Sequence, residues 1–351
     1  MNSTAFLICG WKIGLPDLNK TSISIAPTTS IIQKRYYDLP GTIELMRRLA
    51  REAVVDGVEF QNLAEWEREN PPRDERERRL AAWQASPKYN VDEIAALLQD
   101  AALPILSVHA NRDVGICLCS GDEDEINAGK RLMHESLYLA EKVGASVCVF
   151  HLWDTWKEAF DPGFLQDVLR EVAAGYPGVR ASVENVPTQL PGMTPLELVR
   201  PCEWITLDLR WAALYDELEG FESVKTQIAN VHLRGRLAGG EWVLDDAPFG
   251  FYEALDTIKN VWGYSGLLTL EPSGGLRDGS WQGLVAAMSS ISPPPPTPPA
   301  ASSPPSAHPT ASAMCPESAH KPPTPPSACP RSNPPAPAAG ADQPPASPES
   351  T

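Results

Sequence analysis

Residues 1–291 repeat one pattern eight times: a short apolar or β-branched run that ends in polar residues, and then a stretch with helical periodicity. Runs of four to six residues bounded by polar or turn residues predict strands, and apolar positions three or four apart predict amphipathic helices. Strands that alternate with helices favour a parallel sheet. The predicted strands are Phe6–Gly10, Gly57–Phe60, Ile105–His109, Ser146–His151, Val179–Glu184, Trp204–Asp208, Ala229–Leu233 and Gly266–Glu271.

Eight strand–helix units in about 290 residues match a (β/α)₈ TIM barrel in number and size. A doubly wound open sheet is the second choice, because no Gly-x-Gly-x-x-Gly turn follows the first predicted strand. The predicted helices are Thr42–Ala53, Val91–Ala102, Glu125–Val143, Phe164–Ala174, Pro195–Arg200, Leu218–Gln227, Phe251–Val261 and Trp281–Ser290. The charged run Glu65–Arg79 after the second strand is interpreted as a solvated helix or loop, with a lid over the barrel mouth as the alternative.

The composition changes abruptly after Ile291. Residues 292–351 consist mostly of Pro, Ala and Ser and hold 21 of the 36 prolines. Such a segment cannot bury enough apolar surface to offset the entropy lost on ordering, so a disordered tail is predicted. We therefore expect a barrel domain at 1–291 and a tail at 292–351, which is either dispensable or a proline-rich docking segment.

Charge and cysteine usage narrow the functional class. The chain has 29 Lys and Arg against 45 Asp and Glu, and this acidity disfavours a main role in binding nucleic acid. The seven cysteines form no Cys-x-x-Cys pair, so a reduced cytoplasmic location is expected. No apolar run is long enough for a membrane span, and Ala5–Cys9 is too short for a signal sequence.

Four successive predicted strands carry metal-ligating residue types at their C-terminal ends, where barrel enzymes hold their chemistry. Glu184 ends the fifth strand, Asp208 the sixth and Glu271 the eighth, while His232 lies in the seventh. Three carboxylates with one imidazole suit Mn²⁺, Mg²⁺ or Co²⁺, and Zn²⁺ less specifically. Each residue alone could be a helix cap or a hydrogen-bonded strand end, so their joint occurrence carries the prediction.

These segments resemble the xylose isomerase-like TIM barrel superfamily, which includes sugar isomerases and epimerases, inosose dehydratases and endonuclease IV. The likeness covers residues 1–291. It rests on the order and spacing of six short segments and on Ala247–Gly250 before a helix; the six are Asp56–Phe60, Ser107–His109, Glu184-Asn185, Leu207-Asp208, Val231-His232 and Leu270-Glu271.

The resemblance implies that Glu184, Asp208, His232 and Glu271 bind the metal, and that the two glutamates act as the acid/base pair. One departure concerns the family's Asp-x-x-His, which here runs Asp208-Leu209-Arg210-Trp211. The missing histidine contacts substrate in epimerases and binds metal in endonuclease IV. The Asp-x-His after the seventh strand is absent as well, which further weakens an endonuclease IV reading.

The first functional hypothesis is an isomerase or epimerase of a small sugar, polyol or sugar phosphate, acting by proton transfer through a metal-stabilised enediolate. A dehydratase would share the first step and then expel a hydroxyl group. A noncatalytic sugar- or metal-binding barrel is the alternative favoured by Trp211, and an endonuclease IV-like phosphodiesterase is the weakest. The expected partner is a carbohydrate-like small molecule, with the oligomeric state left open.

Further residues are candidates for substrate contact. His109 and His151 end the third and fourth strands and could bind substrate or a second metal ion. Arg234 and Arg236 could hold a phosphate or carboxylate, or form surface ion pairs. Three tryptophans that follow the first and fourth strands could line an apolar wall of the pocket or simply pack, namely Trp11, Trp153 and Trp156.

Overall fold

A computed structural model describes most of the region between residues 21 and 291. The described residues are 21–25, 39–52, 56–62, 88–111, 113–238, 241–244, 247–272 and the single positions 282, 283, 285, 286 and 291. All of them belong to the unit Met1–Pro295. Several sequence predictions lie outside the described residues: Trp11, the charged run 65–79 and the tail 292–351.

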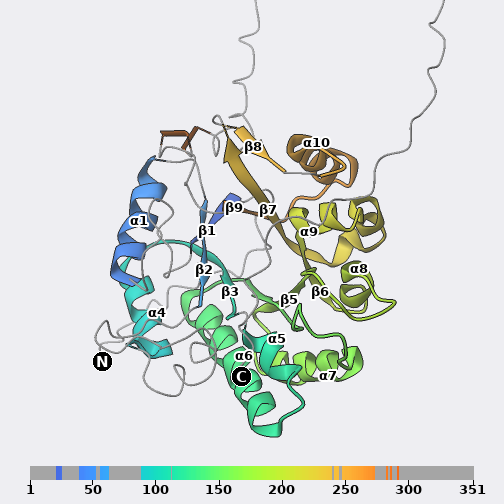
Figure 1. The fold of residues 1–351 in the computed structure, drawn as a ribbon. Coiled ribbons are helices and arrows are strands. Elements are labelled where there is room, and N and C mark those ends of the chain that lie inside the picture. Colours follow the sequence, from blue (N-terminus) through green and yellow to red (C-terminus); the bar gives the residue numbers. More distant parts are fainter. Residues whose placement is uncertain are drawn as a thin grey trace, which may run out of the picture. The chain divides into compact units, whose positions relative to one another are not determined.

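Eight parallel strands of the described region close into a barrel (Figure 1). Each strand pairs with the next along the chain, β6 pairs with β7, β7 with β9, and β9 with β1, so that the ring is complete. The strands are β1 (Thr21–Ile25), β2 (Gly57–Gln61), β3 (Ile105–His109), β4 (Val147–Phe150), β5 (Arg180–Glu184), β6 (Trp204–Asp208), β7 (Ile228–Ala238) and β9 (Leu267–Pro272). The predicted (β/α)₈ barrel is confirmed.

The predicted first strand, Phe6–Gly10, is wrong. Thr21–Ile25 takes the place between β2 and β9, pairing Ile23 with Val58 on one side and with Leu270 on the other. Residues 6–10 themselves lie outside the described part of the chain. The prediction chose the more hydrophobic run, whereas the barrel uses the run Thr-Ser-Ile-Ser-Ile, which alternates small polar with β-branched apolar residues.

That alternation recurs around the barrel and explains where its polar residues lie. A strand has a period of two, so residues two apart point to the same side. Apolar residues such as Val183 and Leu207 face the helices, whereas buried hydroxyl and amide side chains form a layer inside the barrel. Within that layer Ser182 and Thr206 share a hydrogen bond of 2.6 Å, and Thr269 donates to Asn230 at 2.9 Å. Two residues further along these strands lies the next inward-facing layer, which carries the candidate site.

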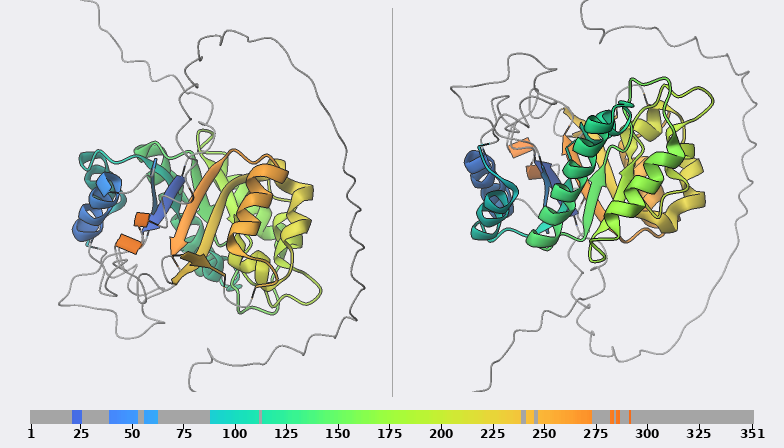
Figure 2. Two further views of the ribbon diagram at one scale, coloured as in Figure 1. Left: turned by 90° about the horizontal axis from the view of Figure 1, so that it is seen from above. Right: turned by 90° about the horizontal axis from the view of Figure 1, so that it is seen from below.

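The helices cover the outer side of the barrel (Figure 2). The described helices are α1 (Leu39–Glu52), α4 (Val91–Asp100), α5 (Asp113–Leu118), α6 (Glu123–Val143), α7 (Pro162–Ala173), α8 (Pro195–Val199), α9 (Leu209–Leu214) and α10 (Phe251–Asp256), with the 3₁₀ segment η1 (Leu218–Gln227) and the π-helical segment η2 (Thr257–Val261). Several of them begin at a side-chain cap, as at Asn90 and Asp122, whose oxygens accept from backbone N–H groups of the first turn.

Besides β1, three described elements were not predicted: α5, α9 and the strand β8 (Glu241–Val243). All three adjoin the barrel's C-terminal ends. α5 and α9 occupy the connections that follow β3 and β6, and β8 pairs antiparallel with the end of β7, from Arg236 to Ala238. The hairpin of β7 and β8 stands at the rim in Figure 1. The predicted helix 281–290 cannot be assessed, because most of its residues lie outside the described part.

Candidate metal centre

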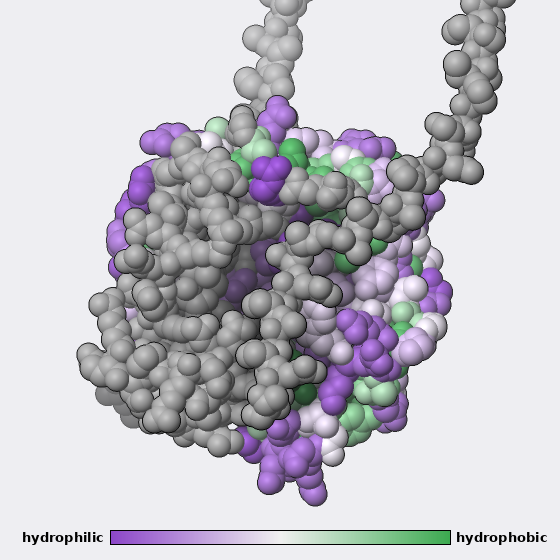
Figure 3. Space-filling model, viewed as in Figure 1, coloured by the Kyte–Doolittle hydropathy of each residue, from purple (hydrophilic) through white to green (hydrophobic). Residues whose placement is uncertain are grey.

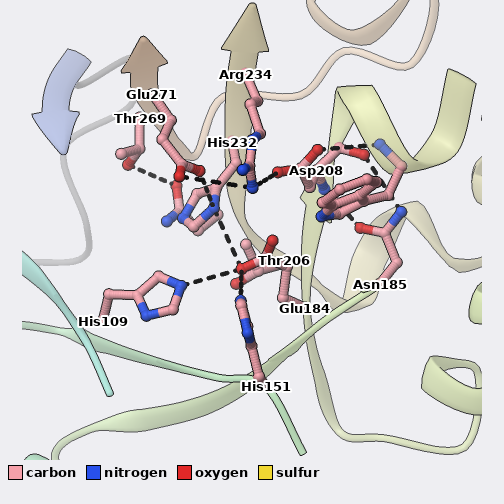
Figure 4. Close-up of polar contacts among 12 residues, drawn as sticks. His109, His151, Glu184, Asn185, Thr206, Asp208, His232, Arg234, Thr269 and Glu271 are labelled. Atoms are coloured by element: carbon pink, nitrogen blue, oxygen red, sulfur yellow. Dashed lines mark hydrogen bonds and ion pairs between the residues drawn. The ribbon is translucent and has the colours of Figure 1, made fainter. Parts of the chain in front are cut away.

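The four predicted ligands converge at the C-terminal ends of β5, β6, β7 and β9 (Figure 4). His232 lies at the centre, with its Nδ1 atom 3.5 Å from Glu184 Oε2 and 3.5 Å from Glu271 Oε2. Asp208, His232 and Glu271 each offer a ligand atom within 4.8 Å of the other two. The strand register explains the proximity, since Asp208 is opposite His232 and the neighbouring strands place Glu184 and Glu271 on either side.

Each of these four side chains keeps one buried polar atom without a hydrogen-bond partner among the described residues. The atoms are Glu184 Oε1, Asp208 Oδ2, His232 Nδ1 and Glu271 Oε2. A buried acceptor that finds no donor is costly, and native structures rarely leave one. His232 belongs to two groups of potential ligands, one with Asp208 and Glu271 and one with His109 and Glu184. A divalent cation would satisfy unpartnered acceptors of this kind. The residues present therefore fit the metal ion that the sequence predicted.

Glu59 on β2 sets the orientation of the His232 ring. The Glu59 carboxylate is fully buried, and its Oε2 atom lies 3.2 Å from His232 Nε2. The same oxygen accepts hydrogen bonds from Ser107 at 2.7 Å and Asn230 at 3.1 Å. With Nε2 facing an ionised carboxylate, a proton stays on Nε2, and Nδ1, which faces the site, is the nitrogen that would give up its proton to bind a metal ion. The sequence analysis missed this role, although an acidic residue inside an apolar strand was a usable signal.

His109 and His151 both contact Glu184. Each Nε2 atom lies 3.1 Å from Glu184 Oε2, and the two rings meet edge to face at 4.9 Å. His109 is also stacked on His232 at 5.7 Å. Both histidines thus lie at the mouth, as predicted, and both contact the Glu184 carboxylate, while His109 Nδ1 also lies 2.9 Å from the Ala110 carbonyl oxygen. This leaves Glu184 Oε1 as the oxygen that is not engaged by a histidine.

The two carboxylate oxygens of Asp208 have different roles, one at a helix cap and one at the candidate site. Its Oδ1 atom accepts from the Trp211 backbone N–H at 3.1 Å and caps α9, while Oδ2 faces the site. Asn185 holds the strand end in place, since its side chain accepts from Asp208 N at 2.6 Å and donates to Asp208 O at 3.3 Å. The cap and ligand interpretations of this residue are therefore compatible.

Arg234 lies beside the ligands on the same side of β7 as His232 (Figure 4). Its Nη1 atom is 3.6 Å from Asp208 Oδ2 and 3.6 Å from Glu271 Oε1. The guanidinium lies over the ring of Trp211, 4.9 Å from its centroid. Trp211, the residue in place of the family's histidine, thus supports an arginine next to the candidate metal ligands.

The charged groups around the site shift one another's pKa values. Burial opposes ionisation of Glu184, but His151 and His232 outweigh it and hold its pKa well below the usual range. Burial likewise acts against the charged form of His232, yet Glu59 and Glu184 raise its pKa well above normal. Burial is the main reason that the pKa of Asp208 rises to about 8, with Glu184 and Glu271 adding to it against the opposing effect of Arg234.

The remaining described residues predicted to contact substrate are Trp153, Trp156 and Arg236. Trp153 is buried in the core, and its indole N–H donates to the Pro187 carbonyl at 2.9 Å. Trp156 is largely exposed. Arg236 follows Arg234 by two residues, in the part of β7 that pairs with β8. In Figure 3, hydrophilic residues are visible at the bottom of a hollow near the centre of the face seen in Figure 1.

Comparisons with known proteins agree with the fold. No protein-family model matches the sequence, and a search of curated proteins finds no relative. Among solved structures, a sugar phosphate isomerase/epimerase from Parabacteroides distasonis ATCC 8503 is similar at a TM-score of 0.50 and 14% identity, covering 77% of this chain and 92% of that one. A D-allulose 3-epimerase from Methylomonas sp. has a TM-score of 0.51 at 15% identity, covering 79% and 97%.

The same enzyme in complex with D-allulose has a TM-score of 0.50 at 15% identity, covering 73% of this chain and 84% of that one. At such identities the likeness establishes the fold and leaves the activity open. Together with the closed ring of eight parallel strands, it shows that this chain shares the (β/α)₈ barrel fold of these structures.

Proposed function

We propose that this protein is a divalent-metal-dependent isomerase or epimerase of a small sugar, polyol or sugar phosphate. The observation that carries the proposal is the set of unpaired buried acceptors on Glu184, Asp208, His232 and Glu271. Solved structures with this fold include a sugar phosphate isomerase/epimerase and a D-allulose 3-epimerase, which supports the same class of reaction.

The donor set of three carboxylates and one imidazole suits Mn²⁺, Mg²⁺ or Co²⁺, with Zn²⁺ as a further candidate. A bound ion would supply electrostatic stabilisation of the negative charge that develops on substrate oxygens when a neighbouring C–H bond ionises. His232 and Asp208 would serve chiefly as ligands, because one is held by Glu59 and the other caps α9.

Glu184 and Glu271 are the residues we assign to proton transfer. They belong to β5 and β9, which are separated in the barrel by β6 and β7, so their carboxylates approach the centre from different sides. Glu184 is completely buried and is held by His109 and His151, whereas Glu271 is 18% exposed. One glutamate would remove the proton next to the substrate carbonyl, and the other would deliver a proton to the product.

This assignment is tested with glutamine substitutions. Glu184→Gln and Glu271→Gln retain size and one oxygen ligand but lose the basic charge. With Mn²⁺ saturating, turnover of a responsive sugar should fall by at least about 10²-fold, the lower end of what general-base catalysis contributes. Glu219→Gln, an exposed glutamate in η1, is the matched control and should keep full activity.

The substrate search uses the full chain with Mn²⁺ in D₂O and a panel of three- to six-carbon ketoses, aldoses, polyols and their phosphates, monitored by NMR. The proposal expects deuterium at the carbon next to a carbonyl in at least one sugar, together with the isomer or epimer. Loss of a hydroxyl group instead would indicate a dehydratase on the same residues. Tight metal binding without any exchange or product would favour a noncatalytic binding barrel and overturn the proposal.

A further inference from the structure

The buried polar atoms without hydrogen-bond partners at the barrel mouth are of two kinds, acceptors and donors. The acceptors on Glu184, Asp208, His232 and Glu271 call for a cation. The donors are Trp211 Nε1 and Arg234 Nε, and neither has an acceptor among the described residues. A metal ion satisfies only the acceptors, so it leaves the two N–H groups still in need of an oxygen.

The two donors belong to side chains in direct contact. The Arg234 Cζ atom lies over the Trp211 ring, 4.9 Å from its centroid, so the two side chains that carry these donors pack against each other. Arg234 is 22% exposed, which leaves it within reach of a molecule in the mouth. Its approaches to Asp208 and Glu271, both 3.6 Å, are ion pairs too long for good hydrogen bonds, so these carboxylates leave the guanidinium donors available.

The surrounding charge indicates which kind of oxygen would bind there. Within the described site Arg234 is the one permanently charged cation among four carboxylates: Glu59, Glu184, Asp208 and Glu271. An uncharged hydroxyl needs no such cation, whereas a carboxylate or phosphate would be repelled by the acidic wall without one. The guanidinium fork matches planar and tetrahedral oxyanions, and the stacked indole keeps the fork in place.

We propose that Trp211 and Arg234 form a subsite for an anionic group of the substrate, a carboxylate or a phosphate, beside the candidate metal ligands. The inference rests on the proposed function and narrows its substrate class to acidic or phosphorylated sugars. Trp211 then has a positive role: it replaces the family's histidine with a ring that supports Arg234 and adds an N–H donor.

The test measures binding by isothermal titration calorimetry, using the full chain loaded with Mn²⁺. The probes are neutral sugars of three to six carbons, the corresponding sugar acids and sugar phosphates, and inorganic phosphate. Wild type should bind at least one acidic or phosphorylated sugar at least about tenfold more tightly than its neutral counterpart. A preference for sugar acids over sugar phosphates, or the reverse, identifies the anion.

Variants then separate the subsite from general electrostatics. Arg234→Gln should remove the preference for the anionic sugar, and Arg234→Lys should restore only part of it, because the ammonium lacks the fork. Trp211→Phe keeps the ring under Arg234 and removes only the N–H, so a loss of roughly two- to tenfold is expected for the anionic probe alone. Arg210→Gln, an exposed arginine that also lies over Trp211, is the control and should bind as wild type does.

The outcomes distinguish this inference from the proposed function. If wild type binds or exchanges neutral sugars as well as anionic ones, or if Arg234→Gln keeps the preference, the subsite is refuted while the isomerase or epimerase assignment stands. If Arg210→Gln loses the preference to the same extent, the effect is one of overall charge, and the subsite is again refuted. Metal content, measured on every variant, verifies that Arg234→Gln leaves the ligand set intact.

Discussion

Glu59 is not one of the four candidate metal ligands, but it contacts one of them, His232. Its carboxylate is buried and receives Ser107, Asn230 and His232 on a single oxygen, Oε2. An acidic residue inside an apolar strand was a usable signal, but its partner could not be read from the sequence, because Glu59 meets His232 only when the barrel closes and brings β2 near β7. Glu184, Asp208, His232 and Glu271 could be predicted because their strands are neighbours in the sequence as well as in the barrel.

Glu59→Gln should weaken metal binding by about 10- to 100-fold, the usual effect of removing a carboxylate that orients a ligating histidine. The amide no longer favours a proton on Nε2 of His232, so the Nδ1 lone pair is presented less often. Metal titration of the variant measures the affinity, and imidazole ¹⁵N shifts, followed as a function of pH, report the tautomer of the neutral His232 ring. Glu123→Gln, an exposed residue of α6, should behave as wild type. Unchanged affinity and tautomer in Glu59→Gln would rule out the positioning role.

Metal binding should release protons and weaken as the pH falls. Burial, together with Glu184 and Glu271, raises the pKa of Asp208 to about 8, so this group is largely protonated at pH 7. His232, with its pKa raised by Glu59 and Glu184 against the effect of burial, also holds a proton. Both must be lost on binding, so affinity should drop about tenfold per pH unit for each proton below its pKa. Calorimetry in buffers of different ionisation enthalpy counts the protons, and a count of zero at pH 7 would contradict this account.

At the scale of elements, the sequence predicted best the strands β3 and β6, which are buried except for one partly exposed residue each. The bounds of β3 and β6 agree with the prediction residue for residue, because apolar runs between polar residues leave little choice. The error at β1 has the opposite cause, since a barrel strand that alternates polar and apolar residues resembles a surface segment. The short helices α5 and α9 were missed because six residues are too few for a visible period.

In α5, the close approach of another backbone segment requires a glycine at position 115. A Cβ atom at this position would lie 2.5–2.7 Å from the backbone of Trp153, closer than real contacts allow. Gly115→Ala would gain about 0.5–1 kcal/mol in helix propensity but must displace the chain that follows β4, and overpacking of this kind typically costs about 1–3 kcal/mol. Thermal unfolding should therefore show a net loss of stability. Gly178→Ala, where nothing lies within 4 Å of the new atom, is the matched control and should be neutral. An unchanged melting temperature for Gly115→Ala would mean that the Trp153 backbone yields freely.

At the scale of the whole molecule, the number of strand–helix units and the acidic strand ends were enough to predict the barrel and the location of its site. The Arg234–Trp211 contact was beyond reach, because it depends on how α9 turns back against β7. The membrane prediction is tested only in part: no helix in the described region is long and apolar enough to cross a membrane.

The proposed boundary between the barrel domain 1–291 and the tail 292–351 can be tested by two truncations only a few residues apart. Ile291 is 2% exposed and belongs to the core of the barrel unit, whereas the sequence beyond Ser292 is rich in Pro, Ala and Ser and offers few apolar anchors. A chain that ends at Ser292 should keep the melting temperature and metal content of the full protein. A chain that ends at residue 286 loses the buried isoleucine and should be destabilised by about 2–5 kcal/mol, the usual effect of emptying such a site.

Calorimetric unfolding and metal analysis of the two truncated chains test this boundary. Equal stability of both would place the end of the domain earlier, and a loss in the longer chain would show that the tail contributes to the barrel.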